Sequence, residues 1–435
     1  MRMPIFTFFR RRHDAASVVA RLRTSSRLPL RTGRDGAPRS HGALRSTLKA
    51  TLIGTAVLVP PGVLGGAGFG YSDAETLLLK ALREIRFAQL DHARQTIGHL
   101  LDRYPNFRLA HLVQGDLWLA KARPLQSVGN TAQPIDQLQG LRAEAAARAR
   151  REIDSVRADQ VPANFWRLPP TQQFALAVDV EKSRLYVLEN QAGRLVRVAD
   201  FYATVGKAGG GKAREGDQRT PLGAYVLQGS IAREKLTDFY GAGAFPLDYP
   251  NVWDKRQGRN GYGIWLHGVP ADTYARAPRA SDGCVVVSNP DLKLIERFVT
   301  PGRTPFVIAT SIDWVDPDTA GKNAQGLLTA VERWRSDWQA LDTPRYLQHY
   351  ASNFTSDTQR LSEWREQKTA VNAAKTWAKI ELANLSAVQY PGEKDLAIVT
   401  FDQNYQSSNL SGQARKRQLW QRIDGRWQII YEGSI

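Results

Sequence analysis

A thiol and an imidazole occur together in a stretch of the chain where both are otherwise absent. Cys284 is the only cysteine, and His267 is the only histidine between His111 and His349. A free thiol has a pKa of about 8.5 and is mostly protonated at neutral pH. An adjacent imidazole can take that proton and leave a thiolate that attacks a carbonyl. The pair therefore predicts a cysteine nucleophile with a histidine base.

Two short apolar runs indicate what holds this pair. Residues 264–266 (Ile-Trp-Leu) predict a buried strand that ends at His267, and residues 285–287 (Val-Val-Val) predict a strand that starts just past Cys284. The alternative is structural, because a lone buried cysteine often acts as a small hydrophobe and such a histidine is often a hydrogen-bonded core residue.

Glycines flank both candidate residues. Gly268 and Gly283 lack a Cβ, so backbone groups can come close to a reacting carbonyl. The N–H groups of Gly283 and Cys284 are therefore candidate donors to an oxyanion.

Three segments resemble the L,D-transpeptidase catalytic domain. Residues 267–268 (HG) and 281–284 (SDGC) are similar to that family's H-G, gap, S-H-G-C signature, and residues 216–225 (GDQRTPLGAY) are similar to its G-D-x-x-T-P-x-G-x-Y/F block. The resemblance implies a β-rich, sandwich-like fold, a cysteine nucleophile, a histidine base, and a Gly268 backbone that orients the imidazole. It also implies a peptidoglycan stem-peptide substrate, attacked at the carbonyl of an L-configured centre.

Two positions depart from the family pattern. Asp282 stands where the family has a histidine, and Val286 stands where an arginine usually follows the cysteine. The first change puts an acid beside the thiol, where it can raise the thiol pKa or reshape the acceptor side. The second removes a cation expected to contact substrate. Both departures resemble the branch of cell-shape-determining L,D-carboxypeptidases, and Ser281, Asp282 and Gly283 are candidate oxyanion or substrate-binding residues.

Length and charge bound the architecture. The chain has 435 residues and a net charge of +17, which predicts about two to four domains. Residues 1–50 carry 12 Lys/Arg against two acidic residues, so this head supplies +10 and the remainder only +7. The net positive charge of the chain therefore does not indicate nucleic-acid binding. One cysteine excludes an intramolecular disulfide, and the seven scattered histidines predict no metal or cofactor.

The basic head precedes an uncharged apolar run, residues 50–70, broken by Pro60 and Pro61. This pattern favours a signal peptide that exports the chain to the periplasm, with an uncleaved inner-membrane anchor as the alternative.

Residues 71–170 have helical periodicity. Ala93 and Pro105 stand at tetratricopeptide-like spacing, so we expect either a groove for cell-wall protein partners or a small helical domain packed on its neighbours. A linker helix near residues 135–157 contains an arginine-rich run, residues 148–151, which we expect to face solvent.

Residues 171–312 form the expected catalytic domain, and strand patterns from residue 174 to residue 205 predict an antiparallel meander. Residues 206–212 match G-x-x-x-x-G-K, but Ala213 replaces the Ser/Thr of a phosphate loop and no helix follows. We therefore expect a mobile glycine-rich loop beside the site.

Aromatic side chains come shortly before or within the catalytic strand. Tyr240 lies in a long segment that is rich in aromatic and basic residues, and Trp265 lies in the strand that ends at His267. They are candidates for lining a substrate cleft. Ordinary surface packing is an equal alternative for the long segment.

Residues 313–323 are expected to form a linker, and residues 324–435 a C-terminal domain. The spacing of Leu327, Val331 and Trp334 predicts an amphipathic helix. Long strand-like runs follow, with a hairpin turn expected at Asp424-Gly425. The pattern resembles the conical nuclear-transport-factor-2-like fold, and we expect a binding or dimerising accessory domain whose tryptophans are mainly core.

The sequence predicts a multidomain α+β protein. The resemblance implies that it is a periplasmic L,D-carboxypeptidase, which cleaves the bond between an L-centre and D-Ala in peptidoglycan stem peptides. If an amine resolves the acyl-enzyme instead of water, the same site acts as an L,D-transpeptidase. An alternative of another class is a non-catalytic wall-binding scaffold, which Asp282 and Val286 keep open.

Overall fold

The computed structural model describes residues 73–123, 128–129, 135–153, 156–157 and 159–435. The basic head and the apolar run expected in residues 1–70 lie outside this part. All described residues belong to one compact unit, residues 64–435. Within them, no helix is both long and apolar enough to cross a bilayer.

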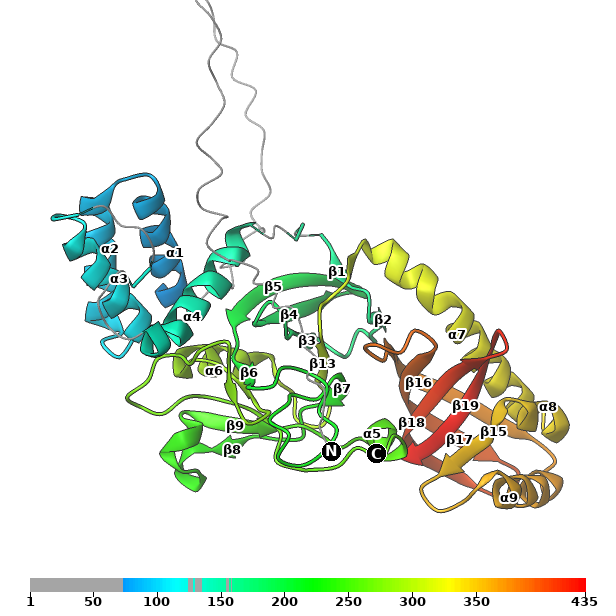
Figure 1. The fold of residues 1–435 in the computed structure, drawn as a ribbon. Helices are drawn as coiled ribbons and strands as arrows, with labels where there is room; N and C mark the ends of the chain where they lie inside the picture. The colour runs from blue at the N-terminus through cyan, green and yellow to red at the C-terminus, as the bar shows by residue number, and fades with distance from the viewer. Residues whose placement is uncertain (1–72, 124–127, 130–134, 154–155, 158) are drawn as a thin grey trace, which may run out of the picture. The chain divides into compact units, whose positions relative to one another are not determined.

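Four helices form the first part of the described chain (Figure 1). Their buried residues recur every three or four positions, as at Ile97 and Leu100, so each helix packs an apolar face against its neighbours. The helices are α1 (Asp73–Arg86), α2 (Leu90–Arg103), α3 (Arg108–Leu119) and α4 (Ile135–Ile153). The helical character is confirmed, whereas the tetratricopeptide-like character stays a prediction.

The arginine run that we expected to face solvent is partly buried, so that prediction is wrong. The Arg148 side chain is 2% exposed and pairs with Glu144 at 2.9 Å and Glu75 at 3.4 Å. Glu75 also accepts a hydrogen bond at 2.6 Å from Arg184, the first residue of strand β4 (Arg184–Gln191). A buried guanidinium needs such partners, and the network joins the helices to the sheet that follows.

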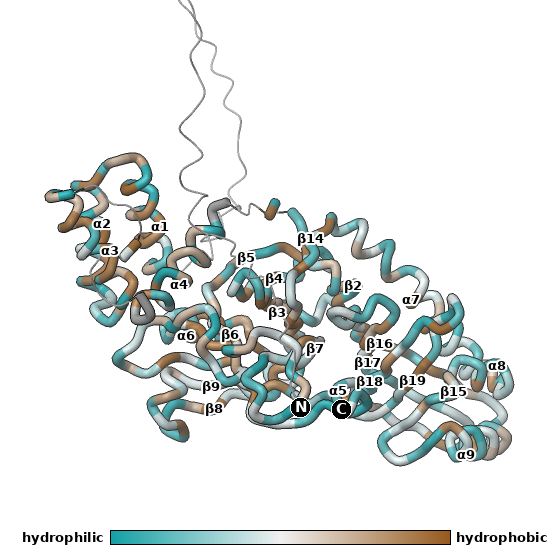
Figure 2. The backbone as a smooth tube through the Cα atoms, viewed as in Figure 1, coloured by the Kyte–Doolittle hydropathy of each residue, from teal (hydrophilic) through white to brown (hydrophobic). Residues whose placement is uncertain are grey.

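A five-stranded sheet forms the first layer of the catalytic part. The order is β5-β4-β3-β13-β7, antiparallel except where β3 pairs with β13, so the expected meander from β3 to β5 is present. Figure 2 shows hydrophobic residues concentrated around β3, which is buried almost throughout. The further strands are β3 (Phe174–Asp179), β5 (Arg194–Tyr202), β7 (Gly223–Val226) and β13 (Pro305–Ala309).

A second sheet, in the order β12-β10-β9-β8, shares a hydrophobic core with the first. Leu176 and Val187 of the first sheet belong to the same buried cluster as Leu266 and Val285 of the second. This two-layer arrangement is the expected sandwich-like, β-rich fold. Its strands are β8 (Ile231–Ala232), β9 (Gly243–Pro246), β10 (Trp265–His267) and β12 (Val285–Val286).

Short elements connect and cover these layers. Strand β6 pairs in parallel with β11, and β1 pairs with β14. The elements are β1 (Val161–Pro162), β6 (Val205–Gly206), η2 (Arg233–Lys235), η3 (Asp238–Tyr240), α5 (Val252–Arg256), β11 (Arg279–Ser281), α6 (Asn289–Ile295), η4 (Glu296–Phe298) and β14 (Trp314–Val315).

The C-terminal part consists of helices packed on a long antiparallel sheet, and Figure 1 shows α7 running along the strands. Asp424 (φ 49°) and Gly425 (φ 78°) form the predicted hairpin turn between the last two strands. The elements are α7 (Pro317–Gln339), α8 (Thr343–Gln348), β15 (Tyr350–Ser356), α9 (Leu361–Ala373), β16 (Ala378–Gln389), β17 (Leu396–Ser407), β18 (Ser411–Ile423) and β19 (Arg426–Ser434).

Two boundaries differ from the sequence prediction. Helix α7 starts at Pro317, so most of the expected 313–323 linker is helical; proline fits there because the first helical N–H needs no partner. The sheet also gains an edge strand, β2 (Phe165–Arg167), from the segment before the catalytic part, and β2 pairs with β16. The C-terminal fold therefore uses residues from both sides of the catalytic part.

The tryptophans of α7 are core residues, as expected. Trp334 is fully buried, and Trp338 stacks on Tyr405 with ring centroids 5.3 Å apart. The domain also contains a cavity of about 260 Å³ bordered by Trp338, Lys368 and Glu432. A partner or ligand for this domain, and a homodimer formed through it, remain predictions.

Candidate functional site

Strand register places the imidazole and the thiol on one face of the second sheet. Strands β10 and β12 run parallel with His267 opposite Val286, and the Val287 N–H donates to the His267 carbonyl at 3.0 Å. Cys284 lies two residues before Val286, and side chains repeat every two residues along extended backbone. His267 and Cys284 therefore project from neighbouring backbone segments toward the same side.

His267 is held as a neutral base. It is 1% exposed, and its Nδ1 lies 2.7 Å from the carbonyl oxygen of Gly268. Because a carbonyl oxygen only accepts, Nδ1 carries the proton and Nε2 is left as the acceptor. Burial lowers the pKa of His267 to about 4, the Gly268 bond opposes this shift, and the charge of Arg276 adds to it.

Cys284 is half-buried and protonated at rest. Burial raises the pKa of its thiol, and the nearby Asp282 charge raises it further; a backbone hydrogen bond from Trp265 and the charge of Arg276 oppose both effects. The S–H donates to the carbonyl of Gly263 at 3.4 Å. The sequence predicted a thiol whose proton an adjacent imidazole can take, and burial of both groups favours the neutral thiol–imidazole pair at rest.

Ser281 organises the turn before the cysteine. Its hydroxyl donates to the Cys284 carbonyl at 2.6 Å and accepts from the Gly283 N–H at 3.2 Å. The Gly283 N–H is thus already used, which weakens its assignment as an oxyanion donor. The Cys284 N–H has no hydrogen-bond partner among the described residues, so it is the better candidate of the two.

Position 283 requires a glycine because of its backbone conformation and the closeness of neighbouring atoms. Its φ is +134°, and a Cβ would lie 2.8 Å from the Arg219 carbonyl oxygen. Only glycine tolerates both conditions without a shift. The glycine therefore lets residues 216–225, the second block of the resemblance, approach the turn that carries Cys284.

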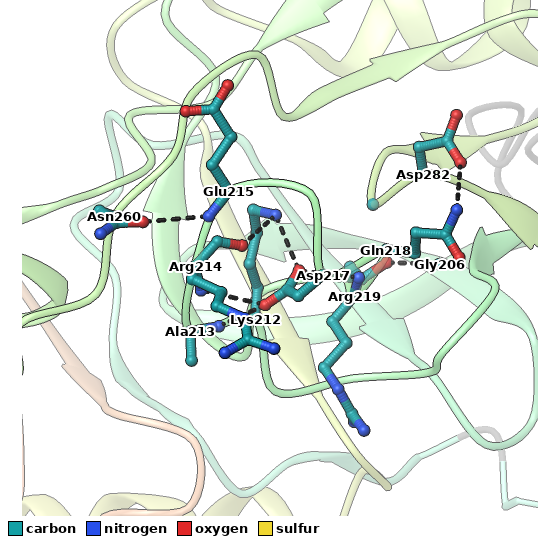
Figure 3. Close-up of polar contacts among 12 residues, drawn as sticks. Gly206, Lys212, Ala213, Arg214, Glu215, Asp217, Gln218, Arg219, Asn260 and Asp282 are labelled. Atoms are coloured by element: carbon teal, nitrogen blue, oxygen red, sulfur yellow. Dashed lines mark hydrogen bonds and ion pairs between the residues drawn. The ribbon is translucent and has the colours of Figure 1, made fainter.

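Asp282 points toward the glycine-rich segment. Its exposed carboxylate pairs with Lys207 at 2.8 Å and accepts from the Gln218 amide at 3.4 Å, and Figure 3 shows the carboxylate of Asp282 facing Gln218. The acid that replaces the family's histidine thus acts on the thiol through its charge.

An internal ion pair anchors the glycine-rich segment, residues 206–212. Lys212 is 4% exposed, pairs with Asp217 at 2.9 Å and donates to the Arg214 carbonyl at 3.1 Å (Figure 3). Burial alone would raise the pKa of Asp217, but Lys212 and three backbone N–H groups hold it well below its usual range. The lysine that a phosphate loop would present to a nucleotide is therefore occupied. The segment is anchored, rather than the mobile loop that we expected.

Aromatic residues surround the imidazole. Tyr240 meets His267 edge-on with centroids 5.1 Å apart and packs on Trp265 at 4.8 Å. Phe239, which is 48% exposed, lies 5.9 Å from His267. The structure thus brings Tyr240 and Trp265 to the site, and the exposed Phe239 marks its solvent side.

Two residues at the site were missed from sequence. Asn289 accepts from the N–H groups of Ala242 (2.9 Å) and Val269 (3.1 Å), which fixes the turn after His267. Arg276 acts electrostatically on both His267 and Cys284. Neither stands in a motif, and only long-range packing brings them to the site.

The described residues contain no group of three or more His, Cys, Asp or Glu side chains suited to hold a metal ion. The site is thus defined by a thiol, an imidazole and backbone donors on a β-sandwich.

The fold and the site define the class of a β-rich domain with a Cys–His pair at a sheet edge. Comparisons with known families agree: residues 173–308 match the L,D-transpeptidase catalytic domain, and residues 326–433 match the Cds6 C-terminal NTF2-like domain. The chain therefore combines an L,D-transpeptidase-family catalytic domain with a C-terminal NTF2-like domain, as the resemblance implied.

Two solved structures are similar to about two thirds of this chain. Bdellovibrio bacteriovorus Bd1075 is 28% identical with a TM-score of 0.57, over 63% of this chain and 98% of that chain. The helical cell shape determining protein Pgp2 from Campylobacter jejuni is 22% identical with a TM-score of 0.51, over 67% of this chain and 99% of that chain, and shows a shared fold. A comparison with curated proteins gave no significant match.

Proposed function

We propose that this protein is a peptidoglycan L,D-carboxypeptidase that removes the terminal D-Ala from stem tetrapeptides during cell-wall remodelling. The catalytic domain matches the L,D-transpeptidase family, which supports a peptidoglycan-acting enzyme. The structure described as the helical cell shape determining protein Pgp2 shares its fold with 67% of this chain. This likeness supports a role in cell shape.

The observation that carries the proposal is the tautomer of His267. Since Nδ1–H is bound to the Gly268 carbonyl, Nε2 is the nitrogen that can receive the thiol proton. The strand register, with His267 opposite Val286 and Cys284 two residues earlier, directs both side chains toward the same side of the sheet. A base with this orientation beside the chain's only thiol matches the requirement for nucleophilic catalysis.

The reaction follows from these positions. Cys284 Sγ attacks the carbonyl of the L-centre while its proton passes to His267 Nε2, and the Cys284 N–H stabilises the oxyanion. The imidazolium then gives that proton to the departing D-Ala nitrogen, which leaves a thioester. Water, deprotonated by the same imidazole, hydrolyses the thioester and restores the thiol.

Incubation of the full chain with a disaccharide-tetrapeptide, followed by mass spectrometry, tests the proposal. We expect the disaccharide-tripeptide and free D-Ala from the wild type, and neither from Cys284→Ala. Product formation by Cys284→Ser at the wild-type rate would contradict thiol chemistry. Circular dichroism of each variant controls for folding.

A transpeptidase is the second candidate, because the same acyl-enzyme yields a cross-link when an amine replaces water. The expected difference is a cross-linked dimer, or a protein-wall link, in the same mass spectra. Phe239, which is 48% exposed, packs next to His267, so an acceptor amine would approach the imidazole from this solvent-facing side.

A non-catalytic wall-binding scaffold is the candidate of another class. It predicts that Cys284 does not react with iodoacetamide in the folded protein. If the protein is the proposed enzyme, iodoacetamide alkylates Cys284, which adds one label per chain. Because the chain has one cysteine, intact-mass measurement gives an unambiguous count.

The proposed substrate lies outside the inner membrane, so we also propose that residues 1–70 export the chain to the periplasm, as a signal peptide or an anchor. Protein partners of the helical and C-terminal parts belong to the same proposal. Fractionation of cells that express the full chain tests the location.

A further inference from the structure

Arg276 is a half-buried cation at the site that the reaction above does not use. Its guanidinium lies 4.5 Å from the centroid of the Phe239 ring and donates to the Phe239 carbonyl at 3.2 Å. Phe239 in turn packs 5.9 Å from His267. The arginine therefore sits over the aromatic side chain that borders the catalytic imidazole.

The backbone of Arg276 is held from two sides. Its carbonyl accepts from the Tyr202 hydroxyl at 2.8 Å and from the Thr204 hydroxyl at 3.2 Å. Two residues earlier, Tyr274 is 3% exposed and stacks on Phe107 of the helical part at 4.2 Å. The segment is braced by the first sheet and by the helices, so the guanidinium is placed before substrate binds.

This guanidinium has no carboxylate partner within ion-pair distance among the described residues. Asp282, the acid nearest in sequence to the thiol, is paired with Lys207 instead. Partial burial lowers the pKa of Arg276, while the thiol and Asp282 act in the opposite direction. An unpaired, partly desolvated cation is costly unless an anion joins it.

The proposed reaction supplies one anion next to the attacked carbonyl. The residue that leaves, a terminal D-Ala, carries its α-carboxylate one residue beyond the attacked carbonyl, and consecutive α-carbons are about 3.8 Å apart. A group that binds this carboxylate must therefore lie close to the catalytic pair, and Arg276 lies over the Phe239 ring that packs against His267. A guanidinium matches a carboxylate with two parallel hydrogen bonds.

We propose that Arg276 binds the free α-carboxylate of the leaving residue, so that the site selects peptides with a free C-terminus over internal peptide bonds. This inference rests on the proposed function and specifies its substrate class. Val286, buried where the family usually has an arginine, removes one cation from the site, and Arg276 supplies another from a different segment.

Two substrates separate carboxylate recognition from general catalysis: the disaccharide-tetrapeptide with a free C-terminus and the same compound as its C-terminal amide. For the acid, we expect kcat/KM to fall about 30-fold or more in Arg276→Gln, since a charge-assisted bidentate contact is lost. For the amide, we expect a clearly smaller fall in kcat/KM, because Arg276→Gln then removes only the charge that acts on Cys284 and His267. Arg276→Lys recovers part of the loss for the acid.

Arg279→Gln is the matched control, because Arg279 is an exposed arginine in the same segment, with its side chain beside Gly209. It should leave the ratio of acid to amide turnover unchanged. An equal loss for acid and amide in Arg276→Gln would overturn the inference while the carboxypeptidase proposal stands.

Binding gives a readout that does not need turnover. In the Cys284→Ala background, titration calorimetry should show tighter binding of the acid than of the amide, and Arg276→Gln should abolish that preference. The absence of a preference, or its persistence without Arg276, would overturn the inference. Absence of D-Ala release by the wild type, with the preference intact, would instead count against the proposed hydrolysis alone.

Discussion

The buried His267 links the stability of the catalytic domain to pH. Its pKa is about 4 in the folded protein, against 6.5 for an ordinary histidine. The unfolded chain therefore binds a proton first as pH falls. Above pH 6.5 the residue contributes no pH dependence, and between pH 6.5 and 4 the folded state loses stability relative to the unfolded state.

The magnitude follows from the two pKa values. A difference between 6.5 and about 4 corresponds to about 3 kcal/mol of unfolding free energy, fully lost only below pH 4. His267→Gln removes the titrating group and retains a donor for the Gly268 carbonyl. We therefore expect the wild type to lose about 3 kcal/mol more than His267→Gln between pH 7 and pH 4.

Two measurements check this expectation. NMR of protein with labelled histidine, assigned by comparison with His267→Gln, gives the pKa directly. Hydrogen exchange of the peptide that contains β10, followed over urea at several pH values, gives the opening free energy of this sheet. A pKa near 6.5, or the same pH dependence in both proteins, would refute the reasoning.

Three further substitutions test separate features. Gly283→Ala places a Cβ 2.8 Å from the Arg219 carbonyl oxygen, at a residue whose φ is +134°. We therefore expect the free energy of unfolding, measured by thermal denaturation, to fall by about 1–3 kcal/mol and D-Ala release to decrease. The control Gly193→Ala, at positive φ in open space, should keep full activity. Glu75→Gln removes a carboxylate from the buried Arg148 and Arg184. It should lower the free energy of unfolding in urea by about 3–5 kcal/mol, whereas the control Asp73→Asn, at an exposed position, should lower it by less than about 1 kcal/mol. Asp217→Asn frees Lys212 and should speed proteolysis within residues 206–219; an unchanged cleavage rate would show that the ion pair does not anchor this segment.

Local sequence pattern predicted the parts of the site that are close in the chain. The apolar runs on either side of the gap became β10 and β12, and glycines that need positive φ or close contact stand where the motif has them. The helix α7 and the turn at Asp424-Gly425 were predictable for the same reason, since side-chain spacing and turn chemistry are local properties.

Partners that are distant in sequence were not predictable. Arg148 looked solvated because nothing near it reveals that Glu75, about seventy positions earlier, packs against it. Lys212 fitted a phosphate-loop pattern because its partner Asp217 can be recognised only once the loop has closed. Arg276 carries no motif, and its position depends on contacts from Tyr202 and the helical part. In each case a charge gained its role from tertiary packing.

The electrostatics of the site also bear on where this protein would work. Oxidants and alkylating agents attack the thiolate, so a thiol whose pKa is raised by burial reacts with them more slowly than a permanent thiolate would. A neutral resting pair thus suits a lone cysteine in an oxidising compartment, where a permanent thiolate would be lost to disulfide exchange. In the mechanism that we propose, activation is left to the substrate, whose carbonyl receives the sulfur and whose oxyanion engages the Cys284 N–H. Low intrinsic thiol reactivity and catalytic competence are compatible because the proton moves only when both partners are in place.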